Sequence, residues 1–217
     1  MYIRATRVQS PPEKVEDAIK NFETNVVKRL GAAPGYQGAV LLVNRQTGEG
    51  MGVTYWESAR ALGASEQSGI DARTQAATTV AGTRIINVER AELMIMDRAT
   101  SPKAGTFVRA VSGSGDPEKL DAGVNFARTR ALPILKALKG YRAMLAAVDR
   151  QTGRTFTSSV WDTKADLEAS ESKIAATRAE FAKIVDIKPE TLKIEVFEIA
   201  VAELSAAASA VTTAARA

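Results

Sequence analysis

The string Arg45-Gln46-Thr47-Gly48 returns as Arg150-Gln151-Thr152-Gly153, 105 residues further along the chain. The same offset places other identical residues opposite each other: Arg4-Ala5 and Arg109-Ala110, Gly35-Tyr36 and Gly140-Tyr141, Trp56 and Trp161. About 23 of the 78 aligned pairs between residues 3–80 and 108–185 are identical, without a gap. A self-match of this length indicates that a whole folding unit has been duplicated.

Composition narrows the chemistry. The 217 residues include neither Cys nor His, which excludes disulfides, thiolate metal sites, the Ser-His-Asp triad and the commonest metal ligand. We therefore expect no cofactor and no metal. The net charge of +4 comes from scattered Lys and Arg without a basic stripe, so nucleic acid is not expected as a partner.

The predicted location follows from what the chain lacks. Met1-Tyr2-Ile3-Arg4 runs directly into a strand pattern, with no signal peptide before it. No apolar run reaches the roughly 18–20 residues that a membrane-spanning helix needs. We expect a cytoplasmic protein without a membrane partner.

Each half has the pattern strand, helix, strand, strand, helix, strand. In the first half, the apolar positions between 15 and 30 recur every three or four residues, as in an amphipathic helix. Residues 39–43 and 51–56 flank the Gly-containing turn of a β-hairpin. A second helix is expected over 58–80, and Gly63 and Gly69 weaken it and leave more room there than in the second half. The predicted boundaries are repeat 1 at 1–96, a linker at 97–104, repeat 2 at 105–204 and an Ala-rich tail at 205–217.

The predicted fold class is α+β. A βαββαβ unit forms a four-stranded antiparallel sheet with both helices on one face, the ferredoxin-like arrangement. The strands carry apolar residues at both parities, for example Val40-Leu41-Leu42, whereas a sheet with one wet face alternates apolar and polar residues. We therefore predict two sheets packed face to face as an intramolecular pseudo-dimeric α/β barrel. The chain would be a monomer that mimics a dimer, with a further homodimer as the alternative.

The order of elements and two short motifs resemble the antibiotic biosynthesis monooxygenase family of the dimeric α/β-barrel superfamily. The motifs are a Gly-Tyr after the first helix and a strand ending in Trp-acid-Ser/Thr, and they occur here as Gly35-Tyr36 with Trp56-Glu57-Ser58 and Gly140-Tyr141 with Trp161-Asp162-Thr163. The resemblance implies a pocket between sheet and helices in each unit, and activities that include cofactor-independent oxygenation of aromatic compounds. The haem-degrading branch has a Trp where Trp56 and Trp161 lie. It also needs a second-helix His, which this chain lacks, and its first-strand Asn is replaced here, with Arg4 and Arg109 nearby. Haem degradation is therefore not expected.

Six residues are candidates for substrate binding, while no catalytic residue is assigned: Trp56, Trp161, Arg4, Arg109, Tyr36 and Tyr141. Each Trp could stack on a flat substrate, or lock the strand-to-helix corner by burying its ring. Each Arg could bind a carboxylate or enolate. Alternatively, it forms a structural ion pair, with Glu57 or Glu89 in the first half and with Asp162 or Glu198 in the second. Each Tyr could place its hydroxyl in the pocket as a weak acid, or cap the core with its hydroxyl in water.

Two functions compete on these grounds. The first is metal-free oxygenation of a small aromatic ligand, in which the protein supplies orientation, desolvation and anion stabilisation. The second is a non-catalytic barrel that binds a small ligand or serves as a scaffold. A pocket lined by Trp and Arg favours the first function, and a cavity filled by apolar side chains favours the second.

Overall fold

The structure, a computed structural model, describes residues 1–205. Contacts divide the chain into two compact units. Unit 1 contains Met1–Arg90, Lys103–Gly105 and the residues from Phe197, and unit 2 contains Ala91–Pro102 and Thr106–Val196. Apart from Ser205, the predicted Ala-rich tail lies outside the described residues.

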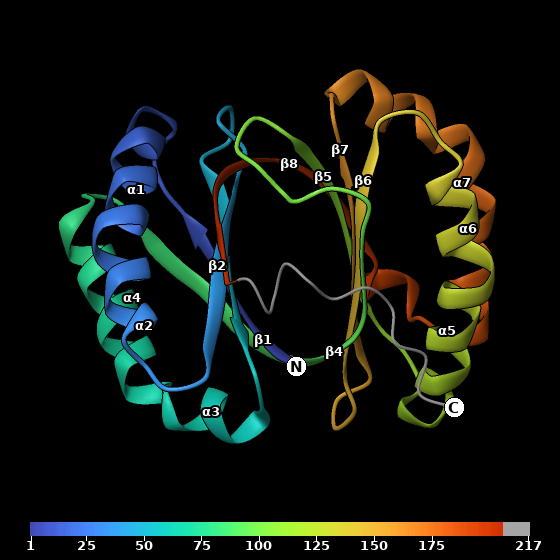
Figure 1. Cartoon of the computed structure of the whole chain (residues 1–217), viewed down its shortest axis with the longest axis horizontal. Helices are drawn as coiled ribbons and strands as arrows, with labels where there is room; N and C mark the ends of the chain where they lie inside the picture. The colour runs from blue at the N-terminus through green and yellow to red at the C-terminus, as the bar shows by residue number, and fades with distance from the viewer. Residues whose placement is uncertain (206–217) are drawn as a thin grey trace. The chain divides into compact units, whose positions relative to one another are not determined.

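Unit 1 follows the predicted order of elements. Helices α1, α2 and α4 lie on one side of its strands (Figure 1). The elements are β1 (Tyr2–Gln9), η1 (Pro12–Lys14), α1 (Val15–Asn21), η2 (Phe22–Val27), α2 (Lys28–Gly31), β2 (Tyr36–Val43), β3 (Glu49–Trp56), α3 (Ala59–Ala64), α4 (Glu66–Thr79) and the first part of β4 (Arg84–Arg98).

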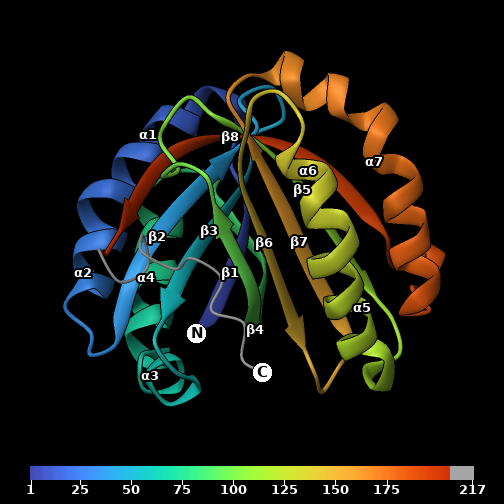
Figure 2. The ribbon, with the colours of Figure 1, turned by 45° about the vertical axis from the view of Figure 1, so that its right-hand side comes forward.

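Unit 2 repeats this order, with α5, α6 and α7 on one side of β6 and β7 (Figure 2). Its elements are β5 (Phe107–Ser114), η3 (Pro117–Lys119), α5 (Leu120–Phe126), η4 (Ala127–Ala131), α6 (Leu132–Lys136), β6 (Tyr141–Asp149), β7 (Arg154–Trp161), α7 (Lys164–Ile184), η5 (Pro189–Thr191) and the first part of β8 (Lys193–Leu204).

The strands are hydrogen bonded in the closed order β1-β3-β2-β8-β5-β7-β6-β4. Within unit 1 the antiparallel register runs from Tyr2↔Trp56 between β1 and β3 to Val43↔Glu198 between β2 and β8. Within unit 2 it runs from Phe107↔Trp161 between β5 and β7 to Arg98↔Ala143 between β4 and β6. The predicted fold class is confirmed: an α+β protein with two βαββαβ units whose antiparallel strands close into a barrel.

The last strand of each repeat is divided between the units. From Ala91 onward β4 belongs to unit 2, and from Phe197 onward β8 belongs to unit 1. Strand β4 also continues to Arg98, into the segment 97–104 expected as a linker. Asp97 is buried there, and its carboxylate accepts hydrogen bonds from Tyr141 and Lys136.

The helical elements differ from the prediction in two respects. The first helix of each repeat contains a π-helical turn, at Phe22–Val27 and Ala127–Ala131. The helix expected over 58–80 is interrupted at Ser65, whereas α7 in unit 2 is continuous. Gly63 lies just before the interruption, and the equivalent residue of the second repeat is Glu168. In a helix interior, Gly is less favourable than Ala by up to about 1 kcal/mol.

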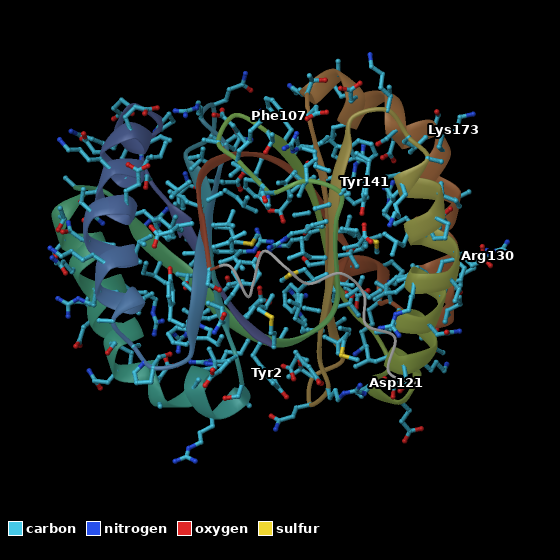
Figure 3. The ribbon with its side chains drawn as sticks, viewed as in Figure 1. Tyr2, Phe107, Asp121, Arg130, Tyr141 and Lys173 are labelled. Carbon is cyan, nitrogen blue, oxygen red and sulfur yellow. The ribbon has the colours of Figure 1, made fainter. Side chains whose placement is uncertain are left out.

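Strand β2 shows why both parities of the strands are apolar. Every residue from Gly38 to Val43 is buried. Ala39, Leu41 and Val43 pack against helix residues Val15 and Phe22 in one core cluster. Charged residues occupy the outer side of the helices, as Asp121, Arg130 and Lys173 illustrate for unit 2 (Figure 3).

The repeated Arg-Gln-Thr-Gly string is a turn, as the sequence predicts. Gly48 and Gly153 have φ of 75° and 71°. A Cβ on Gly48 would lie 1.9 Å from the carbonyl oxygen of Ser10, and a Cβ on Gly153 would lie 2.1 Å from that of Gly115. The string therefore lets the hairpin turn press against the backbone that follows the first strand.

We expect Gly48→Ala and Gly153→Ala each to lower the free energy of unfolding by at least about 2 kcal/mol, because left-handed backbone strain adds to the clash with a carbonyl. Urea denaturation followed by circular dichroism measures this. Gly63→Ala is the matched control: a Cβ there meets nothing within 4 Å, so stability should stay equal or rise by up to about 1 kcal/mol. Equal stabilities for all three variants would contradict the turn's role.

Candidate ligand cavities

Each unit contains a cavity between its sheet and its helices. The cavity of unit 1 has a volume of about 90 Å³ and lies among strands β1 to β4, the first helix and α4. Its walls are largely apolar, with Phe22, Val26 and Leu41 among the lining residues. Arg4 is the buried cation that borders it. The space has room for a few water molecules, so a one-ring aromatic is the size class that fits with least movement.

The Arg4 side chain is held at one nitrogen. Only 2% of Arg4 is exposed. Its Nη2 donates hydrogen bonds of 3.0 Å to the carbonyl oxygen of Leu62, to Oγ of Ser65 and to Oε2 of Glu66. Its Nε and Nη1 are buried without a hydrogen-bond partner. A buried unpartnered donor costs about 1–3 kcal/mol, so these nitrogens mark a place where a ligand oxygen would be stabilised.

The local fold supplies these partners. The Ser58 hydroxyl accepts a hydrogen bond from the Ala61 backbone N–H and so caps the start of α3, two residues after the buried Trp56. The interruption of the helix at Ser65 then places the Leu62 carbonyl, the Ser65 hydroxyl and the Glu66 carboxylate beside β1. The Trp-acid-Ser/Thr motif thus sets where the second helix begins, and with it where Arg4 is bound.

Glu66 is the centre of a positively charged cluster. Besides Arg4, it pairs with Arg73 at 3.0 Å and with Arg90 at 2.7 Å. Burial raises the pKa of Glu66, but hydrogen bonds from Arg90 and Arg73 and the charge of Arg4 outweigh it and lower the pKa to about 2. Burial also lowers the pKa of Arg4. The cluster keeps an excess of positive charge next to the cavity.

Unit 2 repeats the network with a different distribution of bonds. Nη1 of Arg109 donates to Oγ of Ser170 at 2.9 Å, and Nη2 donates to the Leu167 carbonyl at 2.7 Å and lies 3.2 Å from Glu171. Arg178 also pairs with Glu171. Burial lowers the pKa of Arg109. The second cavity, also about 90 Å³, is bordered by Arg109 and Arg178.

The ion-pair partners predicted for the two arginines were wrong. Glu57, Glu89, Asp162 and Glu198 were expected, whereas Glu66 and Glu171 hold the guanidinium groups. The reason is that both arginines point into the helix layer, where they reach helix carbonyls. Glu198 instead pairs with Arg45, and Asp162 with Arg142.

The two tryptophans do not line the cavities. Both are fully buried, and their indole N–H groups donate to Thr54 and to Ser159. Trp56 packs with Ala61 and Leu62 at the strand-to-helix corner. The guanidinium of Arg4 lies 5.5 Å from the centre of the Trp56 ring. Trp56 therefore touches the site through Arg4 and does not face the cavity.

The two tyrosines pack edge-on against these tryptophans, with ring centres 5.6 Å apart for Tyr36 and Trp56 and 6.1 Å apart for Tyr141 and Trp161. Neither lines a cavity of its unit. The expectation of hydroxyls in water was wrong: Tyr36 Oη is buried without a partner, and Tyr141 Oη donates to Asp97 at 3.0 Å. Burial raises the pKa of both hydroxyls well above the usual range.

Sequence reasoning missed the residues that complete the site. Ser65, Glu66 and their equivalents Ser170 and Glu171 were not selected, although they are identical at the 105-residue offset. The available signal was that two adjacent polar residues of the second helix are identical in both repeats. Gly69 was noted only for the room it leaves.

Among residues 1–205, no group of three or more acidic side chains is arranged to hold a metal ion. Within the same residues, no helix is long and apolar enough to cross a membrane.

The strand order and the paired cavities define the class of dimeric α/β-barrel proteins, here with both units in one chain. Residues 1–77 match the family model for antibiotic biosynthesis monooxygenase. The first repeat is therefore similar to that family, and the internal match relates the second repeat to the first.

Similar proteins extend over most of the chain. Uncharacterized protein Rv2557 of Mycobacterium tuberculosis (strain H37Rv) is 28% identical over 204 residues, which cover 94% of this chain and 89% of the relative. The crystal structure of an anthrone oxidase-like protein has a TM-score of 0.66 at 13% identity and covers 94% of both chains. An uncharacterized ferredoxin-fold protein from Listeria monocytogenes, related to antibiotic biosynthesis monooxygenases, has a TM-score of 0.51 at 10% identity over 93% of this chain and 96% of that one. At such identities these structures share the fold alone.

Proposed function

We propose that this chain is a cofactor-independent oxygenase for small electron-rich aromatic compounds, with the cavity of unit 1 as its active site. The observation that carries the proposal is the buried Arg4, whose Nη1 has no partner and which borders an apolar cavity. A guanidinium in a water-poor site stabilises a phenolate or enolate oxygen far more than it would in water.

The reaction balances with dioxygen as the oxidant. For a one-ring hydroquinone, the phenol proton leaves to solvent and Arg4 stabilises the phenolate. The phenolate transfers one electron to dioxygen, the phenoxyl radical and superoxide combine at a ring carbon, and the resulting peroxide takes a proton from solvent to form a hydroperoxide. Loss of water from the hydroperoxide gives the hydroxyquinone. One hydroquinone and one dioxygen therefore yield one hydroxyquinone and one water.

The experiment incubates the purified chain with hydroquinones, and with anthrones as larger substrates, and records oxygen uptake and product absorbance. We expect one dioxygen consumed per product and a loss of at least about a hundredfold in rate for Arg4→Met, the usual cost of removing an oxyanion-stabilising donor. Arg109→Met is the matched control and should retain the rate. Absence of turnover with the whole panel, or equal rates for the two variants, would contradict the proposal.

The second candidate is a barrel that binds a small ligand without transforming it. The observation that favours it is the lack of a buried acid or base at the cavity: Glu49 is the carboxylate among the lining residues, and it is exposed and accepts a hydrogen bond from Thr47. In that case the chain would bind hydroquinones without oxygen uptake.

A further inference from the structure

We infer that the two cavities are not equivalent: the first takes a small aromatic anion on Nη1 of Arg4, and Gly69 is the residue that opens this position, which Ile174 closes in the second. The inference rests on the proposed function for placing the substrate in the first cavity. It adds that the ligand is an anion, that the first half of the chain binds it, and that the residue at position 69 determines which cavity can bind it.

The first observation is the state of the two guanidinium groups. In unit 1, Nη2 of Arg4 donates hydrogen bonds to all three of its partners, and Nη1 has no partner. In unit 2, the same three kinds of partner are shared between Nη1 and Nη2 of Arg109. Both Nη atoms of Arg109 are therefore engaged by protein, and Arg4 alone of the two has an Nη to offer to a ligand oxygen.

The second observation is the space beside each guanidinium. A Cβ on Gly69 would lie 2.7 Å from Nη1 of Arg4 and 3.1 Å from Nη1 of Arg73. The residue at the same position of the second repeat is Ile174, which lines the second cavity. Unit 2 therefore has a branched side chain at the position where unit 1 has a glycine packed against the unpartnered Nη1 of Arg4.

The helices show a compensating exchange of side-chain size. Along the second helix, Ala72 and Ala76 border the first cavity, where the second repeat has Thr177 and Phe181. Along the first helix the larger side chains are in the first repeat: Phe22 and Val26 border the first cavity, and the equivalent residues Ala127 and Ala131 border the second. The two cavities keep the same volume of about 90 Å³. In unit 1 the small residues are on the helix that carries the arginine's partners.

The third observation is charge. In unit 1, the single negative charge of Glu66 faces the positive charges of three arginines, Arg4, Arg73 and Arg90. In unit 2, Glu171 faces Arg109 and Arg178. The buried polar atom without a partner that lines the second cavity is the neutral hydroxyl of Ser112. The first cavity therefore attracts an anion more strongly, and its apolar walls favour an aromatic body.

The test measures binding of benzoate by isothermal titration calorimetry on the full chain, with benzyl alcohol as the neutral probe. We expect one benzoate per chain and binding of benzyl alcohol at least about tenfold weaker, since a charge-assisted hydrogen bond is lost. Gly69→Ile should weaken benzoate binding at least about tenfold. The reciprocal variant Ile174→Gly should leave the affinity of the first site within about twofold.

Intrinsic fluorescence assigns the site, because the chain has two tryptophans, one in each repeat. Trp56 lies against Arg4, so benzoate should change the emission of Trp161→Phe and leave that of Trp56→Phe unchanged. Circular dichroism checks that each variant is folded, and Gly69→Ala, with a single added methyl group, serves if Gly69→Ile does not fold. It should still weaken benzoate binding measurably.

Two benzoates per chain, or unchanged affinity in both folded Gly69 variants, would overturn the inference. These readouts need no oxygen and no turnover. Site-specific benzoate binding without oxygenation would therefore reject the proposed activity alone, whereas oxygenation together with equal binding in both cavities would reject this inference alone.

Discussion

Replacing Trp56 with alanine is expected to lower the free energy of unfolding by about 3–5 kcal/mol, the usual cost of deleting a large buried aromatic side chain. The ring is fully buried and packs edge-on against Tyr36. Its removal also leaves the hydroxyl of Thr54 without the indole donor. Chemical denaturation followed by circular dichroism gives the value, and Trp161→Ala should show a similar loss because Trp161 has the same contacts in unit 2.

Thr54→Val is the control that separates packing from hydrogen bonding. It keeps the Trp56 ring and removes the acceptor of its N–H, so the loss should be about 1–3 kcal/mol. If Trp56→Ala lost no more stability than Thr54→Val, the corner would not depend on the buried ring. A structural role for the ring would then be rejected.

Replacing Glu66 with alanine is expected to lower the free energy of unfolding by about 3 kcal/mol, because removing one partner of a buried ion pair leaves the other charge uncompensated. Arg4 would keep Leu62 and Ser65 as neutral partners and lose its carboxylate. Glu171→Ala is the matched variant. It should cost less, because Glu171 is the more exposed carboxylate and faces two arginines where Glu66 faces three.

The pH dependence tests the same carboxylate. The pKa of Glu66 falls from 4.5 to about 2 in the folded chain. Ionised Glu66 therefore stabilises the folded protein above the pKa of the unfolded chain, and this stabilisation is lost as the pH falls from about 5 to about 2. Partial solvent screening leaves roughly 1–2 kcal/mol of this effect. Denaturation curves measured at pH 6 and pH 3 should therefore differ more for the wild type than for Glu66→Gln. An equal pH dependence would show that Glu66 does not hold the cluster.

Much of the fold could be predicted because its signals are local or repeated. The three- and four-residue spacing of apolar residues marks the first helix, and Gly48 marks the hairpin by its left-handed backbone. Interruptions of this regularity were not predictable. The π-helical turn at Phe22–Val27 and the break at Ser65 depend on how each helix settles on its sheet.

The candidate site could be predicted only in part. Arg4 and Arg109 were found because a charged residue inside a strand covered on both faces needs a partner. Which acid supplies that partner depends on the direction of the side chain and on the position of a helix about 60 residues away, so Glu66 and Glu171 were missed. The position of Asp97 in strand β4, next to Tyr141, was missed for the same reason.

By itself the sequence determined the duplication, the order of elements and the apolar character of both strand faces, because periodicity and turn chemistry act over a few residues. The tertiary structure alone decided that β4 and β8 divide between the units, that Trp56 contacts Arg4 and not the cavity, and that Gly69 packs against the unpartnered Nη1 of Arg4. These features arise where residues distant in the chain compete for the same space, and that competition is resolved only when helix and sheet pack together.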